Sequence, residues 1–513
     1  MAVWKVEADY LEQVLPEYRD NPLLEALPDI MSDDETIAAL TATPTYSEDE
    51  RNLDAKYRIH CLSRLLHDYY QPLPQHLDIE KRISVCIRQG YRNRNPAGKE
   101  YALMANESYE AMKEGRYPRP VAGYHPHASG FTIIGVSGVG KSTAVESVLA
   151  QYPQLIEHRE YHGKPLPLKQ ITWLKLDCPH DGSRIEMCYR FFKSVDDVIG
   201  SDYLDQYKKS RTSVGAMLTL MQRIAQEYSL GLLVADEVQH LAQAKSGSDA
   251  MLNFFVTLVN TIGVPVILIG TSKALPILQG QFRQARRSSG HGDLIWNRMK
   301  KERTWTVFVE SIWSYQWIQN RVPLTPEMLD VIYQETQGII VLAVVLYVLL
   351  QEDAIITEQE TFRAEDIRRV SKERMALVQP MLEALRNNDQ KNIDKYEDIT
   401  DILVDEVSSR LASYQDQDLP RSSKTAGAAS LAKLRNEILP FFIKLHKPPE
   451  LVDRLIEQAY QKTKSTDTAA IMEMVYDKLK KEEEATGKGR KEQKDAPKFD
   501  HKEIAGQVDD TLW

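Results

Sequence analysis

The pattern of apolar and polar positions divides the chain into regions of different periodicity. Between Phe131 and about Glu310, short runs rich in β-branched residues alternate with longer segments whose apolar residues recur every three or four positions. Strands buried on both faces are apolar throughout, so this alternation predicts an α/β fold with a parallel sheet covered by helices on both faces. We expect strands at 131–136, 171–178, 231–238, 265–271 and 304–310, and helices in the gaps, for example at 214–228 and 251–262.

The regions on either side of this core have helical periodicity. After Ser311 the strand pattern ends, and consecutive helices are expected over 311–322, 325–338, 339–353 and 357–375, with Thr325 and Thr357 as N-caps. The last stretch is highly charged and poor in apolar residues, which favours a flexible tail. The predicted domains are a helical N-terminal extension, the α/β core, a helical lid, a helical C-terminal region and a tail whose apolar end could bind a partner: 1–125, 126–310, 311–375, 376–480 and 481–513.

Composition and charge limit the classes of function. The net charge of −10 means that the overall field does not attract nucleic acid, so any DNA contact must come from local basic patches or from many subunits together. The most apolar stretch, 338–350, is too short to span a bilayer, and the N-terminus has no secretory h-region. The cysteines show no metal-binding spacing, so we expect free thiols in a reducing cytoplasm: Cys61, Cys86, Cys178 and Cys188.

A phosphate-binding motif follows the first expected strand. The stretch from Gly135 to Ser142 fits G-x-x-x-x-G-K-[ST] between a strand and a helix. Its glycines allow backbone N–H groups to surround an anion, and the helix N-terminus adds its dipole. Lys141 is expected to reach the β- and γ-phosphates of ATP, and Ser142 to hold Mg²⁺. The predicted ATP-binding residues are Gly135, Val136, Ser137, Gly138, Val139, Gly140, Lys141, Ser142 and Thr143.

Two other strands end in polar residues that complement this loop. Asp236 and Glu237 follow an apolar strand, where two carboxylates are costly without cations. We expect Asp236 to bind Mg²⁺ through water and Glu237 to orient or deprotonate the attacking water. Thr271 ends the strand expected at 265–271. If this strand is inserted between the first and third strands, the Thr271 hydroxyl would lie near the γ-phosphate; the alternative is a strand-end cap.

At this point the chain resembles a known family. The order of motifs is similar to that of AAA+ ATPases of the initiator and MuB-like branch, and more closely to TnsC, the regulator ATPase of Tns-type transposons, and its TniB relatives. The stretch 251–274, MLNFFVTLVNTIGVPVILIGTSKA, and the N-terminal blocks are the most specific. The resemblance covers about 18–390 and is carried by 18–28, 69–96, 152–160, 174–183, 231–241, 251–274 and 379–386.

The resemblance implies a P-loop AAA+ core, a helical lid and a function in transposition. ATP binding would drive subunits into a ring or spiral on double-stranded DNA, largely regardless of sequence. A target selector of the TnsD/TniQ type would recruit this oligomer, which would then activate the TnsA and TnsB transposase. Hydrolysis of ATP would disassemble it.

The resemblance also assigns roles to single residues. Thr271 occupies the sensor-1 position. A finger arginine, reaching the γ-phosphate of a neighbouring subunit, is expected just before the fifth strand; Arg298 best fits the distance to the strand expected at 304–310, with Arg286 and Arg287 as alternatives. Many AAA+ lids carry G-x-x-R, but here the matching stretch is Gly338-Ile-Ile-Val341, without a basic residue.

DNA contacts are expected after the second strand. Ser183, Arg184 and Lys193 are candidates for contacts with the phosphate backbone, and repeated around a ring they would form a basic track. A second basic cluster could meet DNA or the selector: Arg88, Arg92 and Arg94 around Tyr91.

Two alternatives stay open. A replication initiator or clamp-loader-like ATPase would carry a DNA-reading helix-turn-helix, and none is evident after residue 390. A signalling ATPase that binds only proteins would show no assembly that depends on DNA.

Overall fold

The computed structural model of the protein contains two compact units, residues 1–51 with 56–416 and residues 417–513 with 52–55. The structure describes residues 3–92, 94–114, 130–209, 212–243, 264–275, 292–389, 393, 399–414, 431, 434–435, 437–442, 445, 447–463 and 468–485. The helix expected at 251–262 and the tail after Ala485 lie outside these residues.

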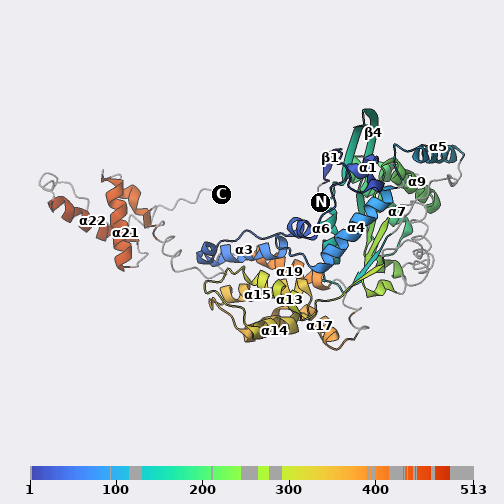
Figure 1. Ribbon diagram of the computed structural model, residues 1–513. Coiled ribbons are helices and arrows are strands. Elements are labelled where there is room, and N and C mark those ends of the chain that lie inside the picture. The colour runs from blue at the N-terminus through green and yellow to red at the C-terminus, as the bar shows by residue number, and fades with distance from the viewer. Residues whose placement is uncertain are drawn as a thin grey trace. The chain divides into compact units, whose positions relative to one another are not determined.

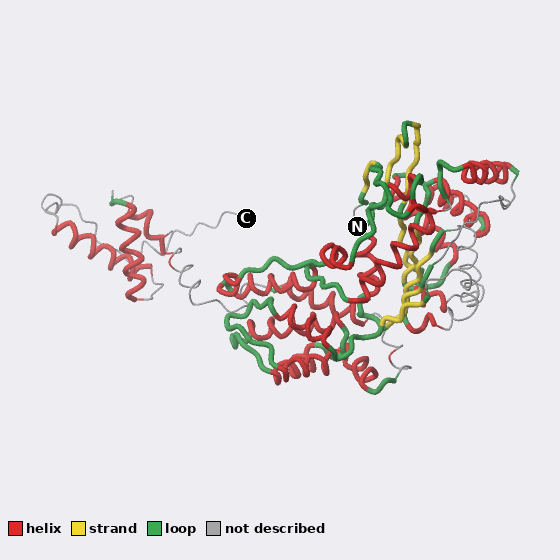
Figure 2. Tube along the Cα trace, viewed as in Figure 1, coloured by secondary structure: helices red, strands yellow, loops and turns green. Residues whose placement is uncertain are grey.

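A parallel five-stranded sheet lies between helices in the first unit (Figures 1 and 2). Its strand order is β5-β6-β7-β2-β8. The strand that leads into the phosphate-binding motif, β2, lies between β7 and β8, and β7 lies between β2 and β6. This confirms the parallel sheet and the inserted position of the strand ending at Thr271. The strands are β2 (Thr132–Gly135), β5 (Trp173–Asp177), β6 (Leu232–Asp236), β7 (Val266–Gly270) and β8 (Asp293–Trp296).

Helices cover both faces of this sheet. Because successive side chains of a strand point to opposite faces, Ile133 packs against the face covered by α4 and α6, whereas Ile134 packs against the face covered by α7 and α9. The strands are therefore apolar throughout, as the sequence pattern predicts. The covering helices are α4 (Pro74–Arg92), α6 (Lys141–Leu149), α7 (Arg184–Ile199) and α9 (Val214–Glu227), with α8 (Tyr203–Lys209) after α7.

The fifth strand is not where the sequence pattern placed it. Residues 304–310 belong to a helix, α13 (Arg303–Trp313), whose buried side chains are three and four positions apart: Trp305, Phe308, Val309, Ile312 and Trp313. The β-branched residues between them suggest a strand, but the aromatic residues set a helical period. The actual fifth strand, β8, has only four residues and is exposed at Asp293 and Ile295, so it is too short to show a clear strand pattern in the sequence.

The lid follows α13 and is helical. Thr325 is an N-cap as predicted, since its hydroxyl accepts a hydrogen bond from the N–H of Met328 at 3.2 Å. Thr357 instead ends α15, and α16 begins after Arg363. Residues 314–325 are not helical, because the Gln316 side chain bonds to the backbone of Trp313 and Val322 and stabilises a loop. The lid helices are α14 (Pro326–Thr336), α15 (Ile340–Ile356) and α16 (Ala364–Arg374), and they are followed by α17 (Gln379–Arg386) and α19 (Ile399–Ser413).

A second, three-stranded sheet was not expected. The edge strand β1 pairs in parallel with β3, and β3 pairs with β4 as a hairpin. His162 and Gly163 at the hairpin turn both have positive φ, 49° and 75°. The His-Gly pair was therefore the one feature of the sequence that could have indicated this hairpin. The strands are β1 (Lys5–Glu7), β3 (Leu155–Tyr161) and β4 (Lys164–Ile171).

The N-terminal residues contact both the core and the lid. Arg58 on α3 binds Glu360 of the lid at 2.6 Å and the carbonyl oxygen of Trp317 at 3.0 Å, whereas α4 packs on the central sheet. The chain between α3 and α4 therefore joins two bodies that both border the phosphate-binding loop. The remaining elements before the core are η1 (Pro16–Tyr18), α1 (Pro22–Glu25), α2 (Asp33–Leu40), η2 (Glu48–Asn52), α3 (Ala55–His67) and α5 (Lys99–Lys113).

The second unit is a small helical bundle. Its core contains Leu434, Ile438 and Phe442 together with residues of α21 (Pro449–Thr463) and α22 (Thr468–Ala485).

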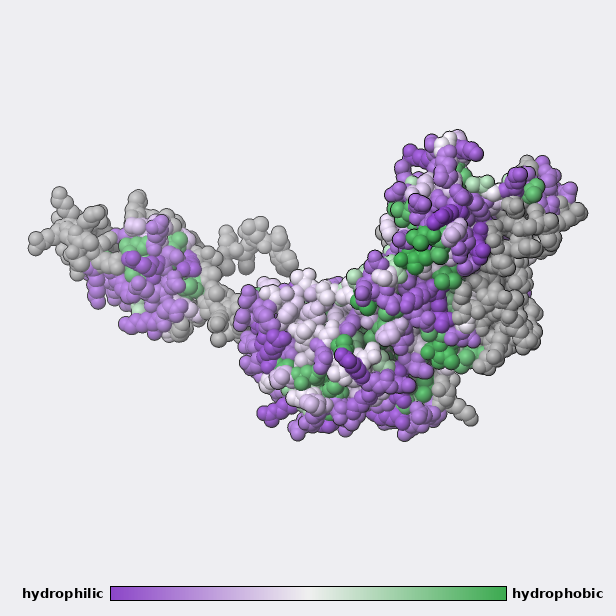
Figure 3. All heavy atoms as spheres, in the orientation of Figure 1, coloured by the Kyte–Doolittle hydropathy of each residue, from purple (hydrophilic) through white to green (hydrophobic). Residues whose placement is uncertain are grey.

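The face of the molecule in Figure 3 is largely polar, with apolar side chains in small groups. Among the described helices, none combines the length and the apolar character needed to cross a membrane. All four cysteines are buried free thiols, as expected.

Candidate functional site

The phosphate-binding loop connects β2 to α6. Gly138 and Gly140 have φ of 76° and 93°, in the left-handed region that favours glycine, so the motif's glycines are required by the backbone. Helix α6 begins at Lys141, and its N-terminus therefore faces the loop. The ammonium group of Lys141 lies within the loop and donates to the carbonyl oxygens of Gly135 and Val136 at 3.1 and 2.9 Å.

Asp236 at the end of β6 is paired with a lysine that the sequence analysis did not single out. Asp236 is almost fully buried, and its Oδ2 lies 3.1 Å from the Nζ of Lys175 on the adjacent strand β5. Lys175 also lies 2.9 Å from Glu146 on α6 and 3.0 Å from Asp177. Burial lowers the pKa of Lys175, but the charges of Asp236, Glu146 and Asp177 outweigh it and raise the pKa above its ordinary value. Lys175 thus connects β6, which ends in Asp236, to α6, which follows the phosphate-binding loop.

Glu237 has an unusual backbone conformation for a non-glycine residue. Its φ is 56°, in the left-handed region, and its N–H donates to Asp236 Oδ1 at 2.8 Å. Such strain costs on the order of 1–3 kcal/mol and persists where surrounding contacts impose it. Its carboxylate accepts a hydrogen bond from Gln239.

The ends of three adjacent strands bring the predicted residues to one edge of the sheet. Lys141 follows β2, Thr271 follows β7, Asp236 ends β6 and Glu237 follows it. Thr271 is buried and its N–H donates to the side chain of Gln239 at 3.1 Å. The sheet order therefore places a cation, two carboxylates and a hydroxyl around the N-terminus of α6.

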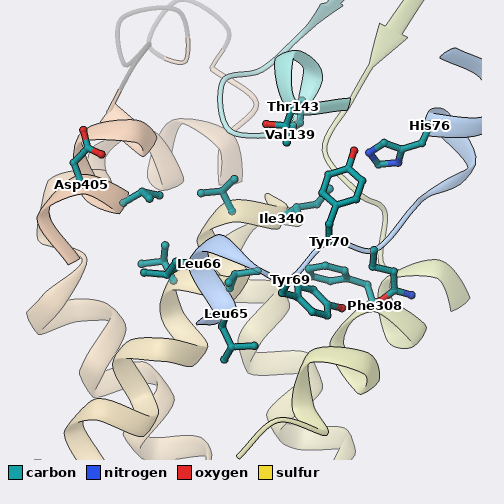
Figure 4. Close-up of a pocket in the computed structure, with 16 residues that line it drawn as sticks. Leu65, Leu66, Tyr69, Tyr70, His76, Val139, Thr143, Phe308, Ile340 and Asp405 are labelled. Atoms are coloured by element: carbon teal, nitrogen blue, oxygen red, sulfur yellow. Dashed lines mark hydrogen bonds between the residues drawn. The ribbon is translucent and has the colours of Figure 1, made fainter. Parts of the chain in front are cut away.

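A cavity of about 430 Å³ adjoins the phosphate-binding loop (Figure 4). Its size lies within the ordinary range for small-molecule sites, and its apolar and aromatic lining suits a planar base. The loop contributes Val139, Gly140 and Thr143. Other residues come from the α3–α4 connection, α4, α13, the lid and α19, including Tyr69, Tyr70, His76, Phe308, Ile340, Val341, Val345, Val404 and Asp405.

His76 in this cavity is held in its neutral form. Burial lowers its pKa to about 4, and its Nδ1 accepts a hydrogen bond from the N–H of Leu73 at 2.7 Å. Its ring packs edge-on against those of Tyr70 and Trp296. No local sequence pattern marks these residues as parts of one site, because they come from segments far apart in the chain.

The candidates for the finger arginine lie on different sides of the fifth strand, β8, in the sequence. Arg298 follows β8, so the reasoning that placed it just before the fifth strand is wrong. Its guanidinium donates to the Gln337 side chain at 2.6 Å and to the carbonyl oxygen of Leu385 at 3.2 Å, both beyond the core. Arg286 and Arg287 do precede β8, but they lie outside the described residues.

The two basic clusters behave differently. Ser183 is the N-cap of α7, Arg184 is exposed, and Lys193 is exposed and lies 3.4 Å from Asp197. In the second cluster, Arg88, Tyr91 and Arg94 are buried.

Their contacts explain the burial. Arg88 donates to Ser84 Oγ at 2.7 Å, and Arg94 donates to the carbonyl oxygen of Leu230 at 2.7 Å and lies over the Tyr91 ring. The expectation that these three residues meet DNA or a selector is therefore wrong. Tyr91 and Arg94 bind the backbone of Ser229 and Leu230 in the core, whereas Arg88 also donates to the carbonyl oxygen of Pro28. Arg92 alone is exposed.

One comparison with known protein families covers the residues of this site. Residues 125–278 match the family described as AAA domain, a stretch that includes the phosphate-binding loop, β6 and β7. No curated protein matches the chain.

Several solved structures are similar to this one. The ORC1 protein of Aeropyrum pernix, solved in complex with DNA, is 16% identical with a TM-score of 0.37, over 61% of this chain and 69% of that one. The ORC2 protein of the same organism is 14% identical with a TM-score of 0.34, over 55% and 67%. CDC6P of Pyrobaculum aerophilum is 13% identical with a TM-score of 0.31, over 63% and 87%.

The fold defines a class. The chain contains a domain with the AAA+ P-loop fold, with a parallel five-stranded sheet, a helical lid and further helical regions on both sides.

Proposed function

We propose that the protein binds and hydrolyses ATP and uses the nucleotide as a switch for assembly on DNA. The observation that carries this proposal is the meeting of Lys141, Asp236, Glu237 and Thr271 at one edge of the sheet, around the N-terminus of α6. A cation and a helix N-terminus bind phosphate, whereas adjacent carboxylates serve a metal and a water molecule.

The residues present fit ATP and Mg²⁺. The backbone of Gly135–Thr143 would hold the phosphates, since its glycines adopt the left-handed conformations that such a loop needs. Ser142 and Asp236 would hold Mg²⁺, which neutralises phosphate charge when bound. Glu237 would orient the attacking water, and the adjoining cavity would take the base.

The finer proposal concerns transposition. The resemblance to TnsC favours an oligomeric regulator on double-stranded DNA that a TnsD/TniQ-type selector recruits and that activates the TnsA and TnsB transposase. Ser183, Arg184 and Lys193 would contact the DNA backbone, and each subunit's finger arginine would complete its neighbour's ATP site.

The charge of one helix of the second unit, α22, bears on the alternative function of a replication initiator. An initiator would be expected to present a basic, DNA-reading helix at its C-terminal end. Helix α22 carries three lysines against five acidic residues, Glu473, Asp477, Glu482, Glu483 and Glu484. Transposase genes beside the gene for this protein would also favour the first function.

Assembly on plain duplex DNA tests the proposal. With ATP and Mg²⁺ at low salt, the wild-type chain is expected to form oligomers on the duplex that electron microscopy can resolve. Lys141→Ala should abolish ATP binding and assembly, whereas Glu237→Gln should bind ATP, hydrolyse it at least 100-fold more slowly and remain on DNA. Lys81→Ala, which removes an exposed lysine paired with Asp33, is the control. A wild-type chain that stays monomeric under these conditions contradicts the proposal.

A further inference from the structure

Gln239 connects two of the residues that define the site. It lies on η3 (Val238–Gln243), directly after Glu237, and its side chain is 3% exposed. Its Oε1 accepts from the N–H of Thr271 at 3.1 Å, and its Nε2 donates to Oε2 of Glu237. One buried amide therefore joins the carboxylate at the end of β6 to the backbone at the end of β7.

The orientation of this amide follows from its partners. A backbone N–H only donates, so the oxygen of Gln239 must face Thr271. The NH₂ group then faces the Glu237 carboxylate, which only accepts when ionised. Both partners are satisfied in this one orientation, and glutamate at the same position would retain an acceptor for Thr271 but lose the donor for Glu237.

The backbone conformation around Gln239 allows its amide to reach both Glu237 and Thr271. A Cβ at Gly270 would lie 2.7 Å from Val238 Cγ2 and 3.0 Å from Gln239 Oε1, so glycine lets η3 approach the end of β7. Glu237 adopts its left-handed conformation in the same turn, with φ of 56°. Strain of this kind costs energy, which the hydrogen bonds from Glu237 N to Asp236 and from Gln239 to Glu237 offset.

We propose that Gln239 is a positioning residue: it holds the Glu237 carboxylate in the orientation needed for water and couples it to Thr271 at the end of β7. This inference rests on the proposed ATPase function. Because Thr271 is the residue expected nearest the γ-phosphate, a shift of the β7 end on nucleotide binding reaches Glu237 through this amide. Gln239 itself acts only through Glu237.

The test separates turnover from binding. Gln239→Leu keeps the size of the side chain and removes both hydrogen bonds. Displacing a base from its proper place costs about 10- to 100-fold in rate. We therefore expect kcat to fall at least 10-fold while the Kd for a fluorescent ATP analogue changes less than threefold. An unchanged kcat overturns the proposal.

Two further variants distinguish a loss of positioning from a loss of stability. Gln239→Glu keeps the size and the acceptor for Thr271 and should lower kcat at least as much, because two carboxylates then face each other. Gln170→Leu is the matched control: Gln170 is also fully buried and bonded twice, to His158 and to the carbonyl of Leu23, but it lies on β4. It should lose stability and keep the wild-type kcat. An equal loss of kcat in Gln170→Leu would assign the effect to stability and contradict the positioning role.

A double-mutant cycle shows whether Gln239 acts through Glu237. In the Glu237→Gln background, Gln239→Leu is expected to cause no further loss of kcat, since residues that act as a unit are strongly non-additive. Independent, multiplicative losses would overturn the inference. If Glu237→Gln is slow but Gln239→Leu is not, only the role of Gln239 fails; if Lys141→Ala still binds ATP, the proposed function fails.

Discussion

Thr400 at the start of α19 lies against Ser137 in the phosphate-binding loop, with their side-chain oxygens 3.3 Å apart. Thr400 is fully buried, and its Cγ2 would lie 2.8 Å from a Cβ built at Gly138. A helix that follows the lid therefore packs directly on the loop, and Val404 and Asp405 of the same helix line the adjoining cavity. The loop is shaped by tertiary contacts as well as by its own glycines.

The first prediction concerns Gly138→Ala. The new methyl group meets Thr400 and forces a non-glycine residue into the left-handed region, which costs about 1–2 kcal/mol. We expect ATP binding to weaken at least 10-fold, measured by titration with a fluorescent ATP analogue. Thr400→Ser in the same chain should recover only part of this loss, because the backbone strain remains.

Gly163→Ala is the control for this variant. Gly163 has nearly the same φ, 75°, but nothing lies within 4 Å of its added Cβ at the hairpin turn. It should lower stability without changing ATP binding. Equal weakening of ATP binding in both variants would show that the contact with Thr400 is irrelevant.

The second prediction concerns Lys175→Met, which keeps the length of the side chain and removes its charge. Asp236 then remains buried without its cation, and breaking a buried ion pair costs about 3 kcal/mol. Urea unfolding should show a loss of this order. Lys193→Met, which removes an exposed pair with Asp197, should show almost none, since surface pairs contribute little.

The pH dependence of the Lys175 effect is a separate check. The pKa of Lys175 is raised in the folded state, so its contribution is fully present below the ordinary lysine pKa and is lost only as the pH rises through the folded value. The stability difference between wild type and Lys175→Met should therefore stay constant from pH 6 to pH 9. A steady decrease across that range would contradict the assignment of the charge.

The third prediction concerns His76. Its pKa is about 4 in the folded protein and 6.5 ordinarily, so the unfolded chain binds a proton that the folded protein excludes. Its contribution is present above pH 6.5 and is lost as the pH falls towards 4, by about 2 kcal/mol at pH 5. His76→Gln should remove this part of the pH dependence. Unfolding measured between pH 7.5 and 5 checks it, with exposed His67→Gln as the control.

The fourth prediction concerns the arginines around β8. Lys141→Ala subunits cannot bind ATP but still carry a finger arginine, so they can complement neighbours that lack one. We expect mixtures of Lys141→Ala with a combined Arg286→Ala and Arg287→Ala chain to recover part of the ATPase rate. Arg298→Ala should bind nucleotide and lose turnover.

Arg298→Ala distinguishes a contact within the subunit from a finger arginine that acts on the neighbouring subunit. Since Arg298 contacts Gln337 and the backbone of Leu385 within its own chain, its loss should not be recovered in the same mixing experiment. Recovery of turnover on mixing with Lys141→Ala would instead make Arg298 the finger.

Local patterns predicted much of the central fold. Four of the five expected strands exist, because strands buried on both faces leave a short apolar run rich in β-branched residues. The error at 304–310 arose where β-branched residues lie between aromatic residues of a helical period, and β8 was missed because it is short and half exposed. The hairpin of β3 and β4 was signalled only by its His-Gly turn.

The sequence by itself determined the phosphate-binding loop and the acidic strand end, because each is a short motif whose spacing is imposed by local backbone geometry. Thr271 was singled out from the expected place of its strand in the sheet. Only the tertiary structure decided that Lys175 neutralises Asp236, that Gln239 joins Glu237 to Thr271, and that Arg88 and Arg94 are buried. These relationships depend on which strands are neighbours and on which helix faces meet, and the order β5-β6-β7-β2-β8 cannot be read from any local segment. Contacts between residues far apart in the chain arise from packing of the whole domain, which no local periodicity encodes.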